Sequence, residues 1–116
     1  MSELRRGDVV WVDCSPSVGV EPKKLRTCVV VSNDIANRFA AGVTVVPTQR
    51  YTAERAGRAY MIDLRGDRSG LDEDRVANAS TVMTYDRRRL RGPSISSLDD
   101  EALDELNDAL RLHLAL

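Results

Sequence analysis

Five short apolar stretches, separated by polar loops and followed by one long amphipathic segment, constrain the fold of this chain most strongly. The stretches are rich in β-branched or small residues and are bounded by glycine, proline or charged residues, which is typical of β-strands. We expect strands at residues 8–14, 28–32, 42–48, 59–64 and 75–83. The stretch 28–32 is apolar on both faces, which predicts a central position in the sheet.

The last 20 residues carry the clearest helical pattern in the chain. Ser97 is a suitable N-cap, Asp100 occupies the capping-box position, and the first turn is acidic. Leucines recur at helical spacing at Leu103, Leu106, Leu110 and Leu114. This spacing predicts a terminal helix with one apolar face.

The connections between these elements are polar. Residues 15–25 contain two prolines, one glycine and two lysines, and they are too long for a tight hairpin. Residues 33–40 begin with capping residues and can form about two helical turns. We expect a mobile connection at residues 49–58 and a helical turn or loop at residues 85–92.

A chain of 116 residues is long enough for one hydrophobic core and too short for two, so residues 1–116 are expected to form a single domain. Short sequential strands followed by one helix predict a mainly β fold with a C-terminal α-helix. We expect a small, strongly curved antiparallel sheet or barrel that this helix covers on one side. Because a half-open barrel gains by covering an edge, a homodimer is expected as well.

No apolar run reaches 18 residues and the N-terminus is polar, so we expect no membrane span, no secretory signal and a cytoplasmic location. Cys14 and Cys28 do not form a CxxC pair. In a reducing compartment, buried free thiols are favoured over a disulfide or a metal site.

The net charge of −1 conceals a separation of charge along the chain. Residues 99–116 carry six acidic side chains and one arginine, whereas residues 1–98 carry 16 basic and 12 acidic side chains. Fourteen of those 16 basic residues are arginines, whose planar donor groups suit phosphate. An arginine-rich coding bias explains the composition equally well, so charge alone decides little.

The residue inventory excludes several chemistries. His113 is the single histidine, near the end of the terminal helix, which removes histidine acid–base pairs, a Ser-His-Asp triad and histidine-rich metal sites. The acidic run 72–74 is better explained as a solvated turn than as a magnesium site. Glycine-rich phosphate motifs are absent from the sequence. We therefore expect no cofactor and no dedicated metal.

Residues 6–38, RGDVVWVDCSPSVGVEPKKLRTCVVVSNDIANR, carry a family resemblance. Arg-Gly-Asp, an apolar strand ending in Asp, a Pro-containing loop, an arginine before a second apolar strand and Ser-Asn-Asp follow one another almost without gaps. This pattern resembles the N-terminal signature of the MazF/PemK family of toxin endoribonucleases. A weaker resemblance continues through VTVVPT, DRRRL and the terminal helix.

The resemblance implies an SH3-like small barrel of the plasmid-toxin (MazF/CcdB/Kid) type and a homodimer. It implies metal-independent, sequence-specific cleavage of single-stranded RNA. It also implies inhibition by a cognate MazE-like antitoxin whose extended segment occupies the RNA groove.

Carried over position by position, the family's catalytic arginine falls on Arg26 and its loop glutamate on Glu21. Its catalytic threonine follows the third strand, where Thr48 is the best match and Gln49 fills the place under a different gap placement. Four positions depart from the pattern: Val20 and Pro22 flank the glutamate, Thr27 replaces the proline after the arginine, and Thr81 stands where glutamine is common.

Elementary chemistry supports Arg26 independently. RNA supplies its own nucleophile, the 2′-OH, so the protein needs only to align it and to stabilise charge on the phosphorane, which a fixed guanidinium does well. We expect Thr48 to donate a hydrogen bond to the same phosphate, and Glu21 to accept the 2′-OH proton or to orient Arg26. The expected products are a 2′,3′-cyclic phosphate and a 5′-OH.

The remaining substrate contacts are expected on two loops that flank the same end of the barrel, residues 15–25 and 49–58, and on the fifth strand. The candidate RNA-binding residues are Lys23, Lys24, Gln49, Arg50 and Thr81. For the two lysines, a purely solubilising role is equally compatible with the sequence.

The main alternative is a non-catalytic, CcdB-like toxin that binds DNA gyrase through its terminal helix. That helix has an acidic face, as many solvated helices do. A family member that binds RNA or antitoxin without cutting is a third possibility.

Overall fold

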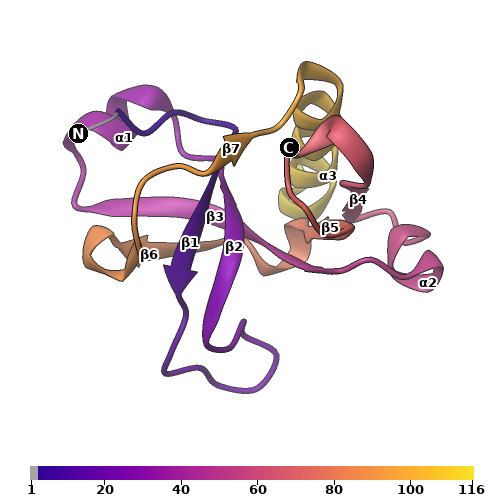
Figure 1. Cartoon of the computed structure of the whole chain (residues 1–116), viewed down its shortest axis with the longest axis horizontal. Coiled ribbons are helices and arrows are strands. Elements are labelled where there is room, and N and C mark those ends of the chain that lie inside the picture. The colour runs from indigo at the N-terminus through magenta and orange to yellow at the C-terminus, as the bar shows by residue number, and fades with distance from the viewer. Residues whose placement is uncertain (1–2) are drawn as a thin grey trace.

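The computed structural model describes residues 3–116. The strands are β1 (Asp8–Asp13), β2 (Leu25–Val30), β3 (Gly42–Arg50), β4 (Met61–Asp63), β5 (Arg75–Asn78), β6 (Met83–Asp86) and β7 (Ser96–Ser97). The helices are α1 (Asp34–Phe39), α2 (Ala53–Ala56) and α3 (Asp100–Leu114), with 3-10 turns η1 (Gly66–Arg68), η2 (Ala79–Thr81) and η3 (Arg87–Arg89). Figure 1 shows α3 beside β4, and the β1–β2 loop projecting away from the sheet.

The sheet is curved because β3 changes partners along its length. One edge of β3 pairs with β2, while the other edge pairs with β6 over its first half and with β5 over its last three residues. The strand order is β4-β5-β3-β2-β1-β7, and each pairing within residues 3–116 is antiparallel. The predicted curved antiparallel sheet with a covering C-terminal helix is confirmed.

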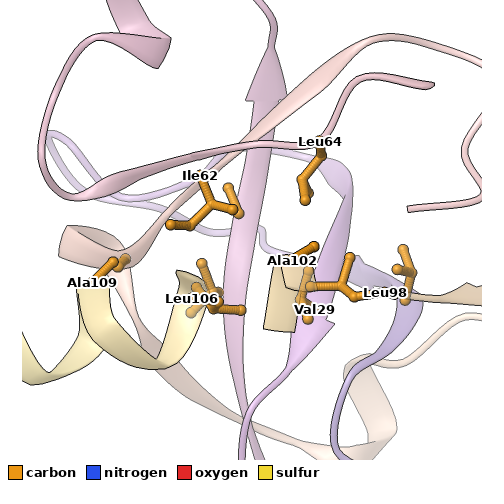
Figure 2. Close-up of a cluster of buried hydrophobic side chains, with 11 residues drawn as sticks. Val29, Ile62, Leu64, Leu98, Ala102, Leu106 and Ala109 are labelled. Atoms are coloured by element: carbon orange, nitrogen blue, oxygen red, sulfur yellow. The ribbon is translucent and has the colours of Figure 1, made fainter. Parts of the chain in front are cut away.

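Both faces of the central strands are buried, as the valine-rich pattern of β2 predicts. Alternation along β1 sends Val9 into a core under α3 and Val10 into a second core on the opposite face. Figure 2 shows the first core, in which Leu106 and Ala102 of α3 pack near Ile62 and Val29. Burial of a leucine side chain of this kind stabilises the fold by about 1.5–3 kcal/mol.

The cap of α3 differs from the sequence prediction. The Asp99 carboxylate accepts a hydrogen bond of 2.7 Å from Ala102 N, which makes Asp99 the N-cap. Ser97 lies in β7, opposite Asp8, and cannot cap a helix that begins three residues later. Asp100 is accordingly the first helical residue instead of a capping-box partner. The acidic first turn is present as predicted.

The predicted strand at residues 75–83 is wrong in its second half. The Asn78 side chain accepts hydrogen bonds from Ser80 N and Ser80 Oγ, which turns the chain into η2 and ends β5. The chain then starts a new strand, β6, at Met83. Thr81 therefore lies in a turn, where its hydroxyl donates to Asn78 O at 3.1 Å.

Two further boundaries differ from the prediction, and both affect the site. β2 begins at Leu25, not at residue 28, so the strand itself holds Arg26. The connection predicted at residues 49–58 is partly regular, because β3 continues to Arg50 and Thr52 caps α2.

Cys14 and Cys28 are free and buried, as predicted. Among residues 3–116, no helix is both long and apolar enough to cross a bilayer.

Candidate functional site

A groove of about 840 Å³, here called the main groove, opens where β2 and β5 begin and β3 ends. Its lining includes four arginines: Arg26, Arg50, Arg55 and Arg75. Trp11, Leu25 and Ile95 line it as well and are 37–53 % exposed. The main groove thus combines cationic donors with an accessible apolar wall.

A smaller hollow of about 200 Å³, the side pocket, adjoins the main groove under the β1–β2 loop. Its lining includes Glu21, Lys23, Arg26, Gln49 and Thr81, all of which the sequence singles out. Arg26 and Gln49 line both hollows, so the two meet at these residues. Lys24 lines neither hollow.

Arginines from β2 and β5, the two strands that flank β3, both donate hydrogen bonds to Thr48 of β3. Arg26 Nη1 in β2 donates to the main-chain oxygen of Thr48 at 3.0 Å. Arg75 in β5 donates to the same oxygen through Nη2 at 3.1 Å and to Thr48 Oγ1 through Nε at 3.0 Å. The strand order β5-β3-β2 creates this arrangement.

The Thr48 hydroxyl is fully used inside the protein. It donates to Thr27 O at 3.0 Å, lies 2.6 Å from the Thr27 hydroxyl, and accepts from Arg75 Nε. Because its hydrogen serves Thr27 O, the contact with Thr27 Oγ1 must be donated by Thr27. Thr48 is 0 % exposed. In this arrangement it presents no donor to the main groove, so its geometry suits holding the two arginines in place.

The arginine pair is poorly neutralised. Arg75 lies 3.8 Å from the Glu73 carboxylate, which is 81 % exposed, and within residues 3–116 Arg26 forms no ion pair within 4.0 Å. Burial, together with the nearby charge of Arg26, lowers the pKa of Arg75. A guanidinium nevertheless stays protonated in proteins. This end of the main groove therefore favours an anion.

Two buried polar atoms at the junction of the hollows have no partner within the described part of the chain: Arg26 Nε and Gln49 Oε1. Native proteins pair nearly all buried polar atoms, so exceptions call for an explanation. One is a donor and the other an acceptor, and both belong to residues that line the two hollows where they meet.

Glu21 is half-buried within the β1–β2 loop. Its Oε1 accepts from Val18 N at 2.7 Å, which fixes the carboxylate at the wall of the side pocket. Oε2 accepts none of the hydrogen bonds found in residues 3–116.

Lys24 is exposed, and its backbone has a structural role. With a φ of 59°, it turns the chain into β2, and its carbonyl accepts a hydrogen bond from Cys14 N.

Metal-ligand geometry is absent from residues 3–116, where no group of three His, Cys, Asp or Glu side chains converges. Residues 72–74 are exposed on a turn, and two of them, Asp72 and Glu73, line the main groove. His113 is exposed in the last turn of α3, far along the chain from both hollows.

Sequence reasoning missed Arg75 and the function of Thr27. Arg75 opens β5 directly opposite Arg50 of β3, but this pairing is not local and no sequence motif marks it. Thr27 was visible only as a departure from a proline. Because proline has no hydroxyl, the departure itself was a signal that a polar partner stands beside Thr48.

Comparison with known proteins agrees with this geometry. Residues 5–114 match the family described as PemK-like, MazF-like toxin of type II toxin-antitoxin system. The chain belongs to this family. The recognition made from residues 6–38 is thereby confirmed.

Three known proteins align with this chain over nearly its whole length. Endoribonuclease EndoA of Bacillus subtilis (strain 168) is 34 % identical over 113 residues, which cover 97 % of this chain and 96 % of that protein. The crystal structure of MazF from Deinococcus radiodurans superimposes with a TM-score of 0.84 at 20 % identity and covers 100 % of both chains. A mycobacterial endoribonuclease in complex with its cognate antitoxin gives a TM-score of 0.78 at 21 % identity, covering 97 % of this chain and 96 % of that one.

Proposed function

We propose that this protein is a sequence-specific endoribonuclease toxin that cleaves single-stranded RNA without a metal ion. The observation that carries the proposal is the Arg26–Thr48–Arg75 arrangement, in which Arg26 lines both hollows and Arg75 lines the main groove. Family membership and the relative named Endoribonuclease EndoA support the same activity.

The proposed reaction is an internal transesterification. The 2′-oxygen of the nucleotide attacks the adjacent phosphorus, a 2′-O–P bond forms, and the bond from phosphorus to the 5′-oxygen breaks. The 2′-OH proton is transferred, by way of Glu21 or water, to the leaving 5′-oxygen. The products are a 2′,3′-cyclic phosphate and a 5′-OH, with no oxidant or co-reactant consumed.

Arg26 is the proposed catalytic residue. Its Nη1 is anchored on Thr48 O, and within residues 3–116 the Nη2 hydrogens are not used by the protein and can serve the phosphate. Donors fixed before the reaction stabilise the phosphorane without reorganisation, and removal of one such donor typically slows a reaction by about 10²–10³-fold.

Glu21 and Thr48 have different proposed roles. Glu21 keeps one carboxylate oxygen available in the side pocket and accepts the 2′-OH proton. Thr48 acts by positioning, since its hydroxyl and main-chain oxygen hold both arginines. This role replaces the expected direct hydrogen bond from Thr48 to the phosphate.

The two hollows provide surfaces for the bases and phosphates of a single strand. Trp11, Leu25 and Ile95 offer apolar surface to bases, and aromatic stacking tolerates many base identities. Arg50 in the main groove, with Lys23, Gln49 and Thr81 in the side pocket, forms the remaining RNA contacts. Lys24 stays a weaker candidate because it lines neither hollow.

We further propose that the toxin acts as a homodimer in the cytoplasm and is neutralised by a MazE-like antitoxin. Structural relatives are described as MazE-MazF from Deinococcus radiodurans and as an endoribonuclease in complex with its cognate antitoxin. An extended, acidic antitoxin segment would compete with RNA for the arginines of the main groove.

The decisive experiment incubates purified protein with a long single-stranded RNA in excess EDTA and maps the new 5′ ends. Wild type should produce discrete cuts, and Arg26→Ala should abolish them. Arg58→Ala is the matched control, because Arg58 is an exposed arginine that lines neither hollow. Absence of cuts from folded, antitoxin-free wild type would contradict the proposal and favour a gyrase-binding or non-cleaving toxin.

A further inference from the structure

We infer that Arg75 is a second phosphate-contacting residue, which clamps the scissile phosphate together with Arg26. This assignment rests on the proposed ribonuclease function and adds a catalytic group that sequence resemblance does not supply. Arg75 opens β5, on the side of β3 opposite to β2, which carries Arg26.

The first support is the common anchor. Arg26 Nη1 and Arg75 Nη2 donate to the same oxygen, Thr48 O, at 3.0 Å and 3.1 Å. The two nitrogens therefore cannot be farther apart than the sum of these distances, about 6 Å. A phosphate that contacts one guanidinium at this point is within reach of the other.

The second support is the number of unused donors. A guanidinium has five N–H groups. Arg75 uses Nε and one Nη2 hydrogen on Thr48, and its Nη1 is 3.8 Å from Glu73, beyond hydrogen-bond distance. Arg26 uses a single Nη1 hydrogen within the described residues. The pair thus holds several oriented donors that the protein itself does not use.

The third support is electrostatic. The Arg75 side chain is 18 % exposed, and the nearest carboxylate, Glu73, is 81 % exposed on the rim. Two cations held this close repel each other, and an anion between them relieves the repulsion. A phosphorane, with more negative charge than the phosphodiester, relieves it further, so the clamp favours the transition state.

The geometry separates Arg75 from the other arginines of the main groove. Arg55 Nη1 donates to Arg50 O at 2.8 Å, and within residues 3–116 neither arginine side chain forms a hydrogen bond with Thr48. Arg50 is exposed to solvent, whereas two hydrogen bonds to Thr48 hold the Arg75 side chain in place. Arg50 and Arg55 are therefore placed to bind neighbouring phosphates, and Arg75 is placed at the reacting one.

The test uses two uncleavable oligonucleotides that contain the cut site of the wild-type enzyme. Both carry a 2′-deoxy nucleotide at the cut, and one also carries a neutral methylphosphonate in place of the scissile phosphate. Affinity is measured by fluorescence anisotropy for wild type, Arg75→Gln and the matched control Arg55→Gln. Cleavage of the ordinary RNA is measured under single-turnover conditions, and thermal unfolding checks the fold.

Arg75→Gln should weaken binding of the phosphate oligonucleotide by about 5–150-fold and leave binding of the methylphosphonate oligonucleotide unchanged. Cleavage should slow by about 10²–10³-fold. Arg55→Gln should weaken the binding of both oligonucleotides equally. If Arg75→Gln does not fold, Arg75→Lys, which keeps the stem and a single charge, takes its place in the same comparison.

The two possible failures are distinguishable. If wild type cuts and the Arg75 variant cuts at the wild-type rate, or loses equal affinity for both oligonucleotides, the assignment of Arg75 is overturned and the ribonuclease proposal stands. A purely structural role of Arg75 would produce that equal loss. If folded wild type does not cut RNA, both proposals are overturned together.

Discussion

The hydroxyl oxygens of Thr27, which lines the main groove, and of Thr48 lie 2.6 Å apart on neighbouring strands. Both residues are buried, and Thr48 also bonds Thr27 O and Arg75. The pair connects β2 to β3 at the point where Arg26 and Arg75 meet. Loss of this pair is therefore expected to lower the stability of the protein and to displace the two arginines.

Thr48→Val should lower the free energy of unfolding by about 1–3 kcal/mol, because it leaves Arg75 Nε and Thr27 O without their buried partner. Urea unfolding measures this loss. Thr44→Val is the matched control: the Thr44 and Thr84 hydroxyls also lie 2.7 Å apart on neighbouring strands, but they are exposed. Equal losses of unfolding free energy in the two variants would show that the buried Thr27–Thr48 pair stabilises the fold no more than the exposed Thr44–Thr84 pair.

Arg26→Lys should slow single-turnover cleavage by about 10²–10³-fold while the fold is retained. Lysine keeps the charge but cannot anchor on Thr48 O and present several oriented donors at once. Arg58→Lys, at an exposed position outside both hollows, should cut at the wild-type rate. Full activity of Arg26→Lys would mean that charge alone suffices.

Glu73→Gln should tighten RNA binding several-fold at low salt. The Glu73 carboxylate, 3.8 Å from Arg75, competes with an incoming phosphate, and its removal leaves the charge of Arg75 uncompensated. Because Glu73 is largely exposed, its loss should not change the melting temperature. Filter binding across a salt series measures the effect, and weaker binding by Glu73→Gln would argue against RNA in this groove.

Trp11→Ala should weaken RNA binding by about 5–150-fold, the loss that corresponds to 1–3 kcal/mol for one stacked base. Trp11 lines the main groove and is 37 % exposed. Phe39→Ala is the matched control, since Phe39 is a more exposed aromatic residue on α1 that lines neither hollow. Similar effects of the two substitutions would contradict a stacking role for Trp11.

Much of the fold follows from local pattern. The apolar strand at the N-terminus and the terminal helix depend on contiguous residues, and both are present as β1 and α3. Of the predicted leucine face, Leu106 is buried and Leu103 and Leu110 are partly buried, but Leu114 is 52 % exposed. The errors arise where one side chain competes with the backbone. Asn78 ends β5 by accepting hydrogen bonds from Ser80, and Asp99 displaces Ser97 as the cap of α3.

The site was predictable only in part. Arg26 and Glu21 follow from the N-terminal signature, and Gln49 follows from the weaker resemblance after the third strand. Arg26 and Gln49 line both hollows, and Glu21 lines the side pocket. Arg75 is distant from Arg26 in sequence, and its approach depends on the order β5-β3-β2. That order is a tertiary property that neither periodicity nor composition encodes.

The measurement that tests the central claim most directly is cleavage of an RNA in which only the nucleotide 5′ to the mapped cut carries a 2′-deoxy sugar. If the 2′-OH is the nucleophile, wild type should cut the all-ribose strand in EDTA, leave a 2′,3′-cyclic phosphate, and fail to cut the substituted strand at that position. Cutting of the substituted strand at an undiminished rate would contradict the account, because the nucleophile would then be water or a protein side chain.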